Sequence, residues 1–249
     1  MRLPQLAAAS FLLLAAFGCP KKDDAAPPLA PRPTPTPAVS EGSLSFDLSG
    51  LAAKSTLEVL PADRVAGLPV RLRVRFDEEV PQTPVVPRER QILVMPAAEY
   101  RDATIVEARL NRGKSIDILK VLVAEKPKEL ERDVPLFPAP PGVQAIRAKL
   151  AYLDFKNGSG VRFVTRLVVD ETPQPNDNLF LTFQGITTDG LRIVAVYWPV
   201  TVKGIPETDD VDVVLKAIQS AKGDALSPDL AKFDAFIASM EVKLPGANP

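Results

Sequence analysis

Two short segments of the sequence are rich in carboxylate and amide side chains, which could bind a metal ion. One segment holds Asp170, Glu171, Asn176, Asp177 and Asn178, and the other holds Glu207, Asp209, Asp210 and Asp212. Calcium takes six to eight oxygen ligands, and loops rich in Asp and Asn can supply them. However, neither segment has EF-hand spacing, and turn formation and helix capping also favour these residue types. A calcium-dependent binding module is therefore an alternative, and we predict no metal ligands in the chain.

Acid–base catalysis is restricted because the chain contains no histidine. Without histidine there is no Ser-His-Asp triad, no imidazole metal ligand and no side chain that ordinarily titrates near neutral pH. A hydrolase that uses Asp and Glu is the remaining enzyme class, and it needs two carboxylates across a cleft. No carboxylate lies in a recognisable motif, and residues 157–160 (NGSG) lack the spacing and the lysine of a P-loop. We therefore predict a protein without catalytic residues or cofactors, with such a hydrolase as the alternative.

An arginine at every second position defines a candidate partner surface. Residues 69–76 read PVRLRVRF, so that Arg71, Arg73 and Arg75 alternate with apolar residues. Strict alternation is typical of a strand with one buried and one exposed face. The arginines could bind an anionic polymer or a lipid headgroup, but we favour a face that is paired with acids of a neighbouring strand. Trp198, the only tryptophan, would add an aromatic contact to this surface if exposed, although we favour a place in the core.

The only cysteine of the chain, Cys19, lies directly behind an apolar segment. Met1-Arg2 gives a positive start, and the apolar run Leu6–Phe17 follows it. About 20 apolar residues are needed to cross a membrane, so this run is too short for a transmembrane helix and fits a signal peptide. We therefore predict a signal peptide over residues 1–18 and export of the chain.

The residues around Cys19 resemble the lipobox of bacterial lipoproteins, in which a small residue precedes a cysteine that becomes lipidated. Gly18 and Cys19 match this pattern, whereas Ala16 stands where the family usually has leucine. Ala16 and Gly18 also suit an ordinary signal peptidase, which would leave a soluble exported protein. The resemblance implies that Cys19 carries the lipid, that the membrane is a partner, and that the protein is anchored outside the cytoplasm at the cell envelope.

A proline-rich segment follows the cysteine over residues 19–42. It contains the run PRPTPTP and almost no large apolar residues, which favours an extended, semi-rigid spacer. We expect one globular domain over residues 43–249. The formal net charge of −1 argues against nucleic acid as a partner, because nucleic-acid binding normally needs a clustered basic field.

Hydrophobic periodicity and turn signals predict an α+β fold for this domain. The predicted strands are 43–46, 56–60, 70–76, 90–95, 144–155, 161–169, 179–184 and 191–198. Residues 97–126 favour helix, split at Gly113 and capped again by Ser115, although strand fits part of this segment. Two helices close the chain, one after Asp210 and one with Pro228 at its first position. The last four strands form an antiparallel meander packed with helices, for which an α/β/α sandwich is a suitable arrangement.

Three segments give the domain a second resemblance. They read QILVMPAAEYRD, YLDFKNGSGVRFVTR and NLFLTFQGITTDGLRIVAVYWPV, and they are similar to a family of secreted bacterial proteins, many of them lipoproteins, with no assigned activity. The strands and the final helix ending in SMEV also resemble the PsbP/Mog1-like fold. These resemblances imply one extracytoplasmic domain without inherited catalytic residues. We therefore expect a binding or accessory module of the cell envelope, with an envelope protein or a small ligand as its partner.

Overall fold

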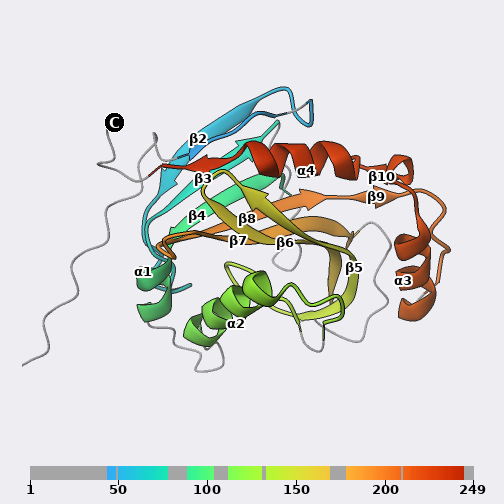
Figure 1. Cartoon of the computed structure of the whole chain (residues 1–249), viewed down its shortest axis with the longest axis horizontal. Helices are drawn as coiled ribbons and strands as arrows, with labels where there is room; N and C mark the ends of the chain where they lie inside the picture. The colour runs from blue at the N-terminus through green and yellow to red at the C-terminus, as the bar shows by residue number, and fades with distance from the viewer. Residues whose placement is uncertain are drawn as a thin grey trace, which may run out of the picture. The chain divides into compact units, whose positions relative to one another are not determined.

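One antiparallel sheet organises the part of the chain that the computed structural model describes, which comprises residues 44–48, 50–77, 89–103, 112–130, 133–168, 178–208 and 210–243. Its seven strands have the order β2-β3-β4-β8-β7-β6-β5 (Figure 1). They are β2 (Ser55–Leu60), β3 (Arg71–Phe76), β4 (Gln91–Pro96), β5 (Val143–Phe155), β6 (Gly158–Val168), β7 (Phe180–Thr187) and β8 (Arg192–Pro199). The predicted meander is confirmed, because β5 to β8 are neighbours in sequence order and pair antiparallel.

Alternating side chains give the sheet two buried faces. On β8, Val194 and Trp198 belong to one hydrophobic core, whereas Ile193 and Ala195 belong to the other. Residues of α3 (Val211–Ser220) and α4 (Leu230–Ser239) complete the first core, and residues of α1 (Ala97–Asp102) and α2 (Arg112–Glu125) complete the second. Figure 1 shows α2 and α4 on opposite sides of the strands. The α+β class is confirmed, and its layers are those of an α/β/α sandwich.

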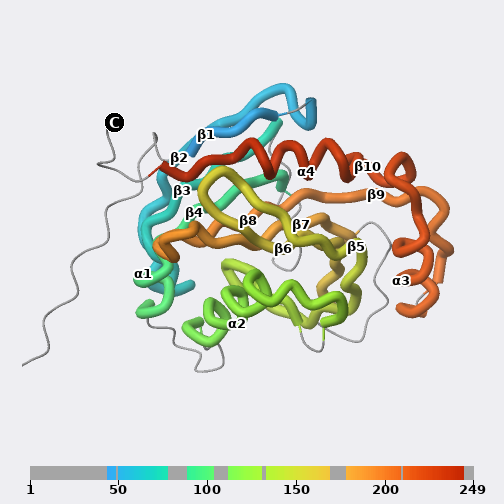
Figure 2. The backbone as a smooth tube through the Cα atoms, viewed as in Figure 1, coloured from blue at the N-terminus to red at the C-terminus, as the bar shows by residue number. Residues whose placement is uncertain are grey.

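Short strands connect the two ends of the described chain. β1 (Leu44–Ser45) pairs antiparallel with β11 (Glu241–Val242), so the first described strand lies beside the last (Figure 2). β9 (Thr201–Val202) pairs with β10 (Leu226–Ser227), which follows the 3-10 turn η3 (Gly223–Ala225). All described residues belong to one compact unit.

The helix starts agree with the sequence at α3 and differ from it at α2 and α4. Asp210 caps α3 as predicted, because its carboxylate accepts hydrogen bonds from the backbone N–H groups of residues 212 and 213. Asp229 caps α4, so Pro228 precedes the cap and does not occupy the first helical position. α2 begins at Arg112, so that Gly113 lies in its first turn and Ser115 is not its cap. The buried stripe of α2 outweighs the low helix propensity of glycine.

The glycines of the NGSG segment lie mainly in a strand and not in a turn. Phe155 pairs with Gly158, so the two-residue hairpin turn is Lys156-Asn157, and both glycines lie in β6. Gly160 lies opposite Gly185 on β7, and a Cβ atom at either glycine would collide with the Phe183 ring. The absence of these side chains therefore lets an aromatic ring lie against the strands.

The proline-rich connector 133–142 is held against the α1/α2 face of the sheet. Its side chains Leu136 and Phe137 are buried in the same core as α2. The N–H of Phe137 donates to Oε1 of Gln184 at 2.9 Å, and the Tyr197 hydroxyl donates to the carbonyl oxygen of Phe137 at 3.0 Å. Two buried polar side chains of the sheet thus fix the path of a segment that has no regular structure.

Replacing Gly160 by alanine should destabilise the fold by about 1–3 kcal/mol, because the added methyl group meets a backbone carbonyl oxygen that has no room to move. Urea unfolding followed by circular dichroism measures this change. Gly223→Ala is the matched control, since a Cβ there lies 3.4 Å from its nearest neighbour, an ordinary contact. Equal unfolding midpoints for the two variants would contradict the packing role of Gly160.

Candidate functional site

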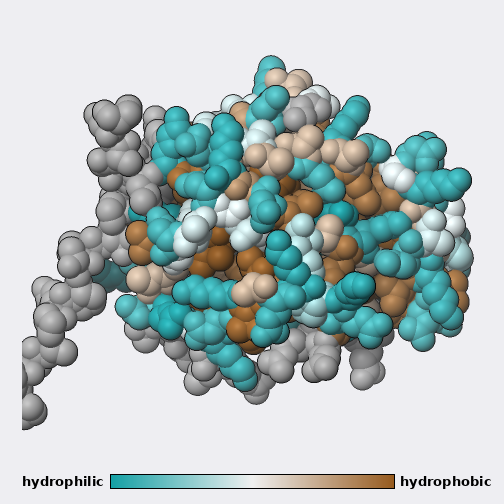
Figure 3. All heavy atoms as spheres, in the orientation of Figure 1, coloured by the Kyte–Doolittle hydropathy of each residue, from teal (hydrophilic) through white to brown (hydrophobic). Residues whose placement is uncertain are grey.

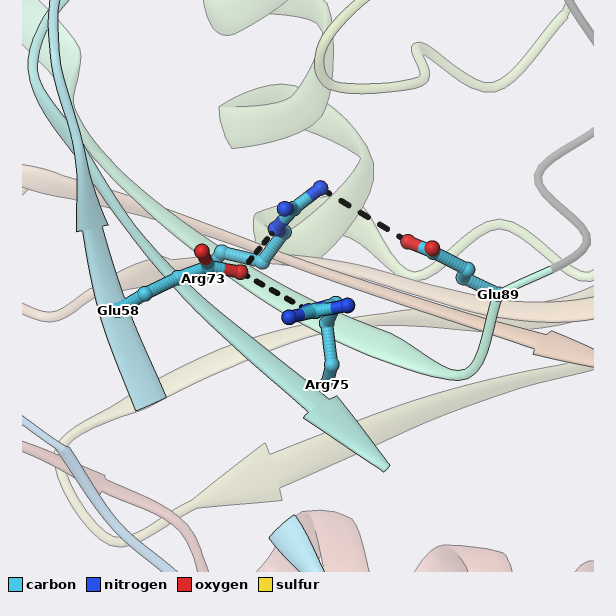
Figure 4. A network of polar contacts seen from close by, with 4 residues as sticks. All are labelled: Glu58, Arg73, Arg75 and Glu89. Atoms are coloured by element: carbon cyan, nitrogen blue, oxygen red, sulfur yellow. Dashed lines mark hydrogen bonds and ion pairs between the residues drawn. The ribbon is translucent and has the colours of Figure 1, made fainter. Parts of the chain in front are cut away.

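The three arginines of β3, Arg71, Arg73 and Arg75, form a stripe. Figure 4 shows two of them, Arg73 and Arg75, beside Glu58 and Glu89. Nε of Arg73 donates to Oε1 of Glu58 at 2.7 Å, and Nε of Arg75 donates to the same oxygen at 3.0 Å. Glu89 lies 3.8 Å from Nη1 of Arg73. Because Glu58 is directly opposite Arg73 on β2, the interpretation that a neighbouring strand supplies the acid is confirmed.

Electrostatics at the stripe favour the paired, charged state. Hydrogen bonding from Arg73 lowers the pKa of the Glu58 carboxyl, and attraction to both arginines adds to this against the opposing effect of burial. Arg71 donates instead to the carbonyl oxygens of Pro61 and Pro69, and burial lowers its pKa. The stripe is therefore half-buried, with counter-charges built into it.

Trp198 does not belong to the same surface as the arginines. Its side chain is only 1% exposed, and its ring centroid lies 5.2 Å from that of Phe76 and 6.0 Å from that of Phe236. The alternation of β8 points Trp198 toward α4, whereas the arginines of β3 point to the opposite face, because their neighbours Leu72 and Val74 lie in the core beneath α4. The core interpretation is confirmed, and Trp198 as a partner contact is wrong.

The structure describes only some of the other site residues that were considered from the sequence. Cys19 and most of the first acidic segment (Asp170, Glu171, Asn176 and Asp177) lie outside the described residues, as does Asp209. Asn178 is buried, and Asp210 caps α3. Within the described ranges, no group of three or more potential metal ligands comes together.

A groove along the outer side of α2 is a further candidate site, with a volume of about 780 Å³. It is lined by Arg101, Gly113, Lys114, Asp117, Ile118, Val121, Leu122, Glu125, Pro127, Glu129 and Leu130. The apolar part comes from α2 and from the segment that follows it, and Val121 is 51% exposed. In Figure 3, hydrophobic residues show between hydrophilic ones in the region of α2.

The sequence carried a signal for this groove. The buried stripe of α2 consists of Ile116, Leu119 and Leu122, and Ile118 is partly buried against the same core. Val121 is also apolar but exposed, so the helix has an apolar position outside the side that packs against the sheet. The sequence alone did not reveal the groove, because it does not show which apolar residues of the helix pack against the sheet.

The charges of α2 run against the helix dipole. Lys114 lies near the N-terminus and Glu125 in the last turn, whereas a helix is stabilised by acids at its start and bases at its end. Glu129 adds a second acid beyond the C-terminus, and Arg101 of α1 bonds Asp117 of α2 at 2.9 Å. The groove therefore has an apolar middle, a basic end and an acidic end, which suits an amphipathic peptide segment.

The carboxyl group with a raised pKa lies away from the groove. Burial raises the pKa of Asp234 on α4, and its carboxylate lies 3.1 Å from Nε of Arg162, which is on β6. This pair is on the α3/α4 side of the sheet, whereas the groove is on the α1/α2 side. Asp234 therefore does not line the groove along α2.

Replacing Glu58 by glutamine should cost about 0.5–1.5 kcal/mol at neutral pH, since one neutral amide replaces the carboxylate shared by two arginines. The folded-state pKa lies below the ordinary value of 4.5, so this stabilisation is present above that value and is lost as the pH falls through the folded-state pKa. Thermal melting between acid and neutral pH measures the difference. Glu207→Gln, at an exposed glutamate, is the control, and a pH-independent difference for Glu58→Gln would contradict the ion-pair account.

Comparisons with known proteins do not identify the chain. No protein-family model matches the chain. No curated protein and no solved structure is significantly similar to it either. In the part of the chain that the structure describes, no helix is long and apolar enough to cross a membrane. The three resemblances named from the sequence stay predictions.

Proposed function

We propose that this chain is a lipid-anchored binding module of the bacterial cell envelope, which lies outside the cytoplasm and holds a segment of an envelope protein in the groove along α2. One observation carries the proposal: the only cysteine follows an apolar run and a small residue, and precedes a proline-rich segment. An unpaired cysteine in an exported chain calls for an explanation, and lipidation supplies one.

The membrane affinity of acyl chains supports the proposed anchor. A single acyl chain binds a membrane only marginally, whereas two or more hold firmly, and the cysteine of a bacterial lipoprotein carries at least two. The proline-rich segment 19–42 would separate the lipid from the domain at up to about 3.1 Å per residue in a polyproline II conformation. The groove would then lie within reach of proteins in or near the same membrane.

Binding is favoured over catalysis for two reasons. The chain has no histidine, so acid–base chemistry near neutral pH would have to come from carboxyl, lysine or tyrosine side chains with shifted pKa values. Asp234, whose pKa is raised, is bonded to Arg162 on the other side of the sheet from the groove. The groove itself offers an apolar middle between opposite charges, an arrangement that recognises an amphipathic helix.

Lipid attachment predicts that cells fed an alkyne-labelled fatty acid will label the native chain and not Cys19→Ser. Click chemistry followed by gel fluorescence measures the label, and partition into the detergent phase of Triton X-114 should be lost in the same variant. Cys19→Ser replaces only the thiol by a hydroxyl group and keeps a small polar residue. Labelling of both chains to the same extent would contradict the anchor.

Binding in the groove predicts a site-specific crosslink. A photo-reactive amino acid at Val121, which lies in the groove, should give a discrete adduct with an envelope protein after irradiation of whole cells. The same amino acid at Val213 on α3, which is 40% exposed and lies outside the groove, is the matched control. The proposal fails if position 121 gives no adduct beyond those at position 213.

A further inference from the structure

The two edges of the sheet differ in how they are protected. Along the edge strand β5, the register with β6 shifts twice, between Gln144 and Ile146 and between Ala148 and Ala151. At the second shift Lys149 has a φ of 55°, and its N–H donates to the side chain of Gln219 on α3. α3 and α4 both pack against β5. Bulges and covering helices are the usual means by which a protein blocks pairing with another chain.

β2, at the opposite edge, has none of these devices. Its six residues pair with β3 in one continuous register, without a shift. The sequence STLEVL contains no lysine or proline, and its single charge, Glu58, is neutralised by Arg73 and Arg75. Val59 is 40% exposed on this strand. Among the described strands, only β3 pairs with β2, so one side of its backbone carries no strand partner there.

The hydrogen bonds of β3 show which groups of β2 point outward. The N–H of Phe76 donates to the carbonyl oxygen of Arg90, toward β4, so Ser55, which lies opposite Phe76, does not bond to β3. In an antiparallel strand, the direction of both backbone groups alternates from residue to residue. The N–H and C=O groups of Ser55, Leu57 and Val59 therefore point away from the sheet.

We propose that β2 pairs antiparallel with β2 of a second copy of this chain, with Leu57 at the two-fold axis. A two-fold pair must place outward-pointing residues opposite each other, and an axis through any one of residues 55 to 59 does so. Centring on Leu57 pairs Ser55, Leu57 and Val59 among themselves and forms about six backbone hydrogen bonds, whereas centring on Thr56 or Glu58 pairs only two of these three with each other. Centring on Glu58 would also place two like charges directly opposite each other. Centring on Val59 would place Leu57 opposite Pro61, which has no N–H, and centring on Ser55 would leave Val59 outside the pair.

Side chains in this register are compatible. On the face of the arginine stripe, Glu58 lies opposite Thr56 of the second copy, so no like charges are directly opposed. On the other face, Leu57 meets Leu57 of the second copy, and Val59 meets Ser55. The two sheets join into one continuous sheet, and the edges that remain are the two protected β5 strands. The inference is independent of the proposed function, because it uses only the sheet.

Disulfide trapping tests the register. In the full chain with Cys19→Ser, which removes the only native thiol, one sample carries Ser55→Cys and another carries Val59→Cys. Directly opposed residues of a hydrogen-bonded pair have Cα atoms about 5.5 Å apart, which suits a disulfide. Two copies of the same cysteine would instead lie about 13 Å apart along the strands, which no disulfide spans. A mixture of the two variants should therefore give a disulfide-linked dimer under mild oxidation, and each variant alone should not.

Association without cysteines gives the second measurement. The mass of the native chain, measured by light scattering during size-exclusion chromatography, should rise toward a dimer as the concentration is raised. Val59→Lys should stay monomeric, because a charge on the exposed edge opposes pairing. Val143→Lys, at a residue 65% exposed on β5, should still dimerise. A native chain that is monomeric throughout, or a mixture that gives no more linked dimer than the single variants, would overturn the proposal.

Discussion

The pairing of β4 with β8 is the constraint on which the rest of the structure depends. It joins the three N-terminal strands to the C-terminal meander, with Gln91 opposite Tyr197 at one end and Pro96 opposite Arg192 at the other. Because side chains alternate between faces, a slip of one residue would exchange the two cores. This register decides that Trp198 lies beneath α4 and that the arginine stripe faces the other way. The positions of the groove, the arginine stripe and the two sheet edges all follow from this register.

Features that depend on near neighbours in the sequence could be predicted. The alternation in β3, the meander of β5 to β8 and the Asp210 cap of α3 follow from local patterns of apolar residues and turn signals. The pairing of Arg73 and Arg75 with acids was also predictable, because an exposed row of like charges on a strand needs counter-charges. Only the identity of the acid, Glu58, required the register of β2.

Features that depend on distant segments could not be predicted. A core position for Trp198 was expected, but the side of the sheet on which it is buried is set by the helix α4, which follows it in the sequence by more than 30 positions. The path of connector 133–142 is set by the hydrogen bonds of Phe137 with Gln184, which accepts, and with Tyr197, which donates, and both of these residues lie on strands that come later in the chain. The groove needs α2 and the segment 127–130 together, and the place of β2 at the edge of the described sheet follows only from the strand order.

The proposed membrane anchor, the groove and the β2 edge, which has one partner among the described strands, fit one physical picture. Chains tethered to the same membrane would meet at a raised effective concentration, so that weak contacts through β2 or the groove would become sufficient. The central claim is that Cys19 carries the lipid, and mass spectrometry of the N-terminal peptide from the protein of native membranes tests it most directly. The account predicts a mature chain that begins at Cys19 and carries the mass of at least two acyl chains. An unmodified Cys19, or a mature chain that begins at any other residue, would contradict it.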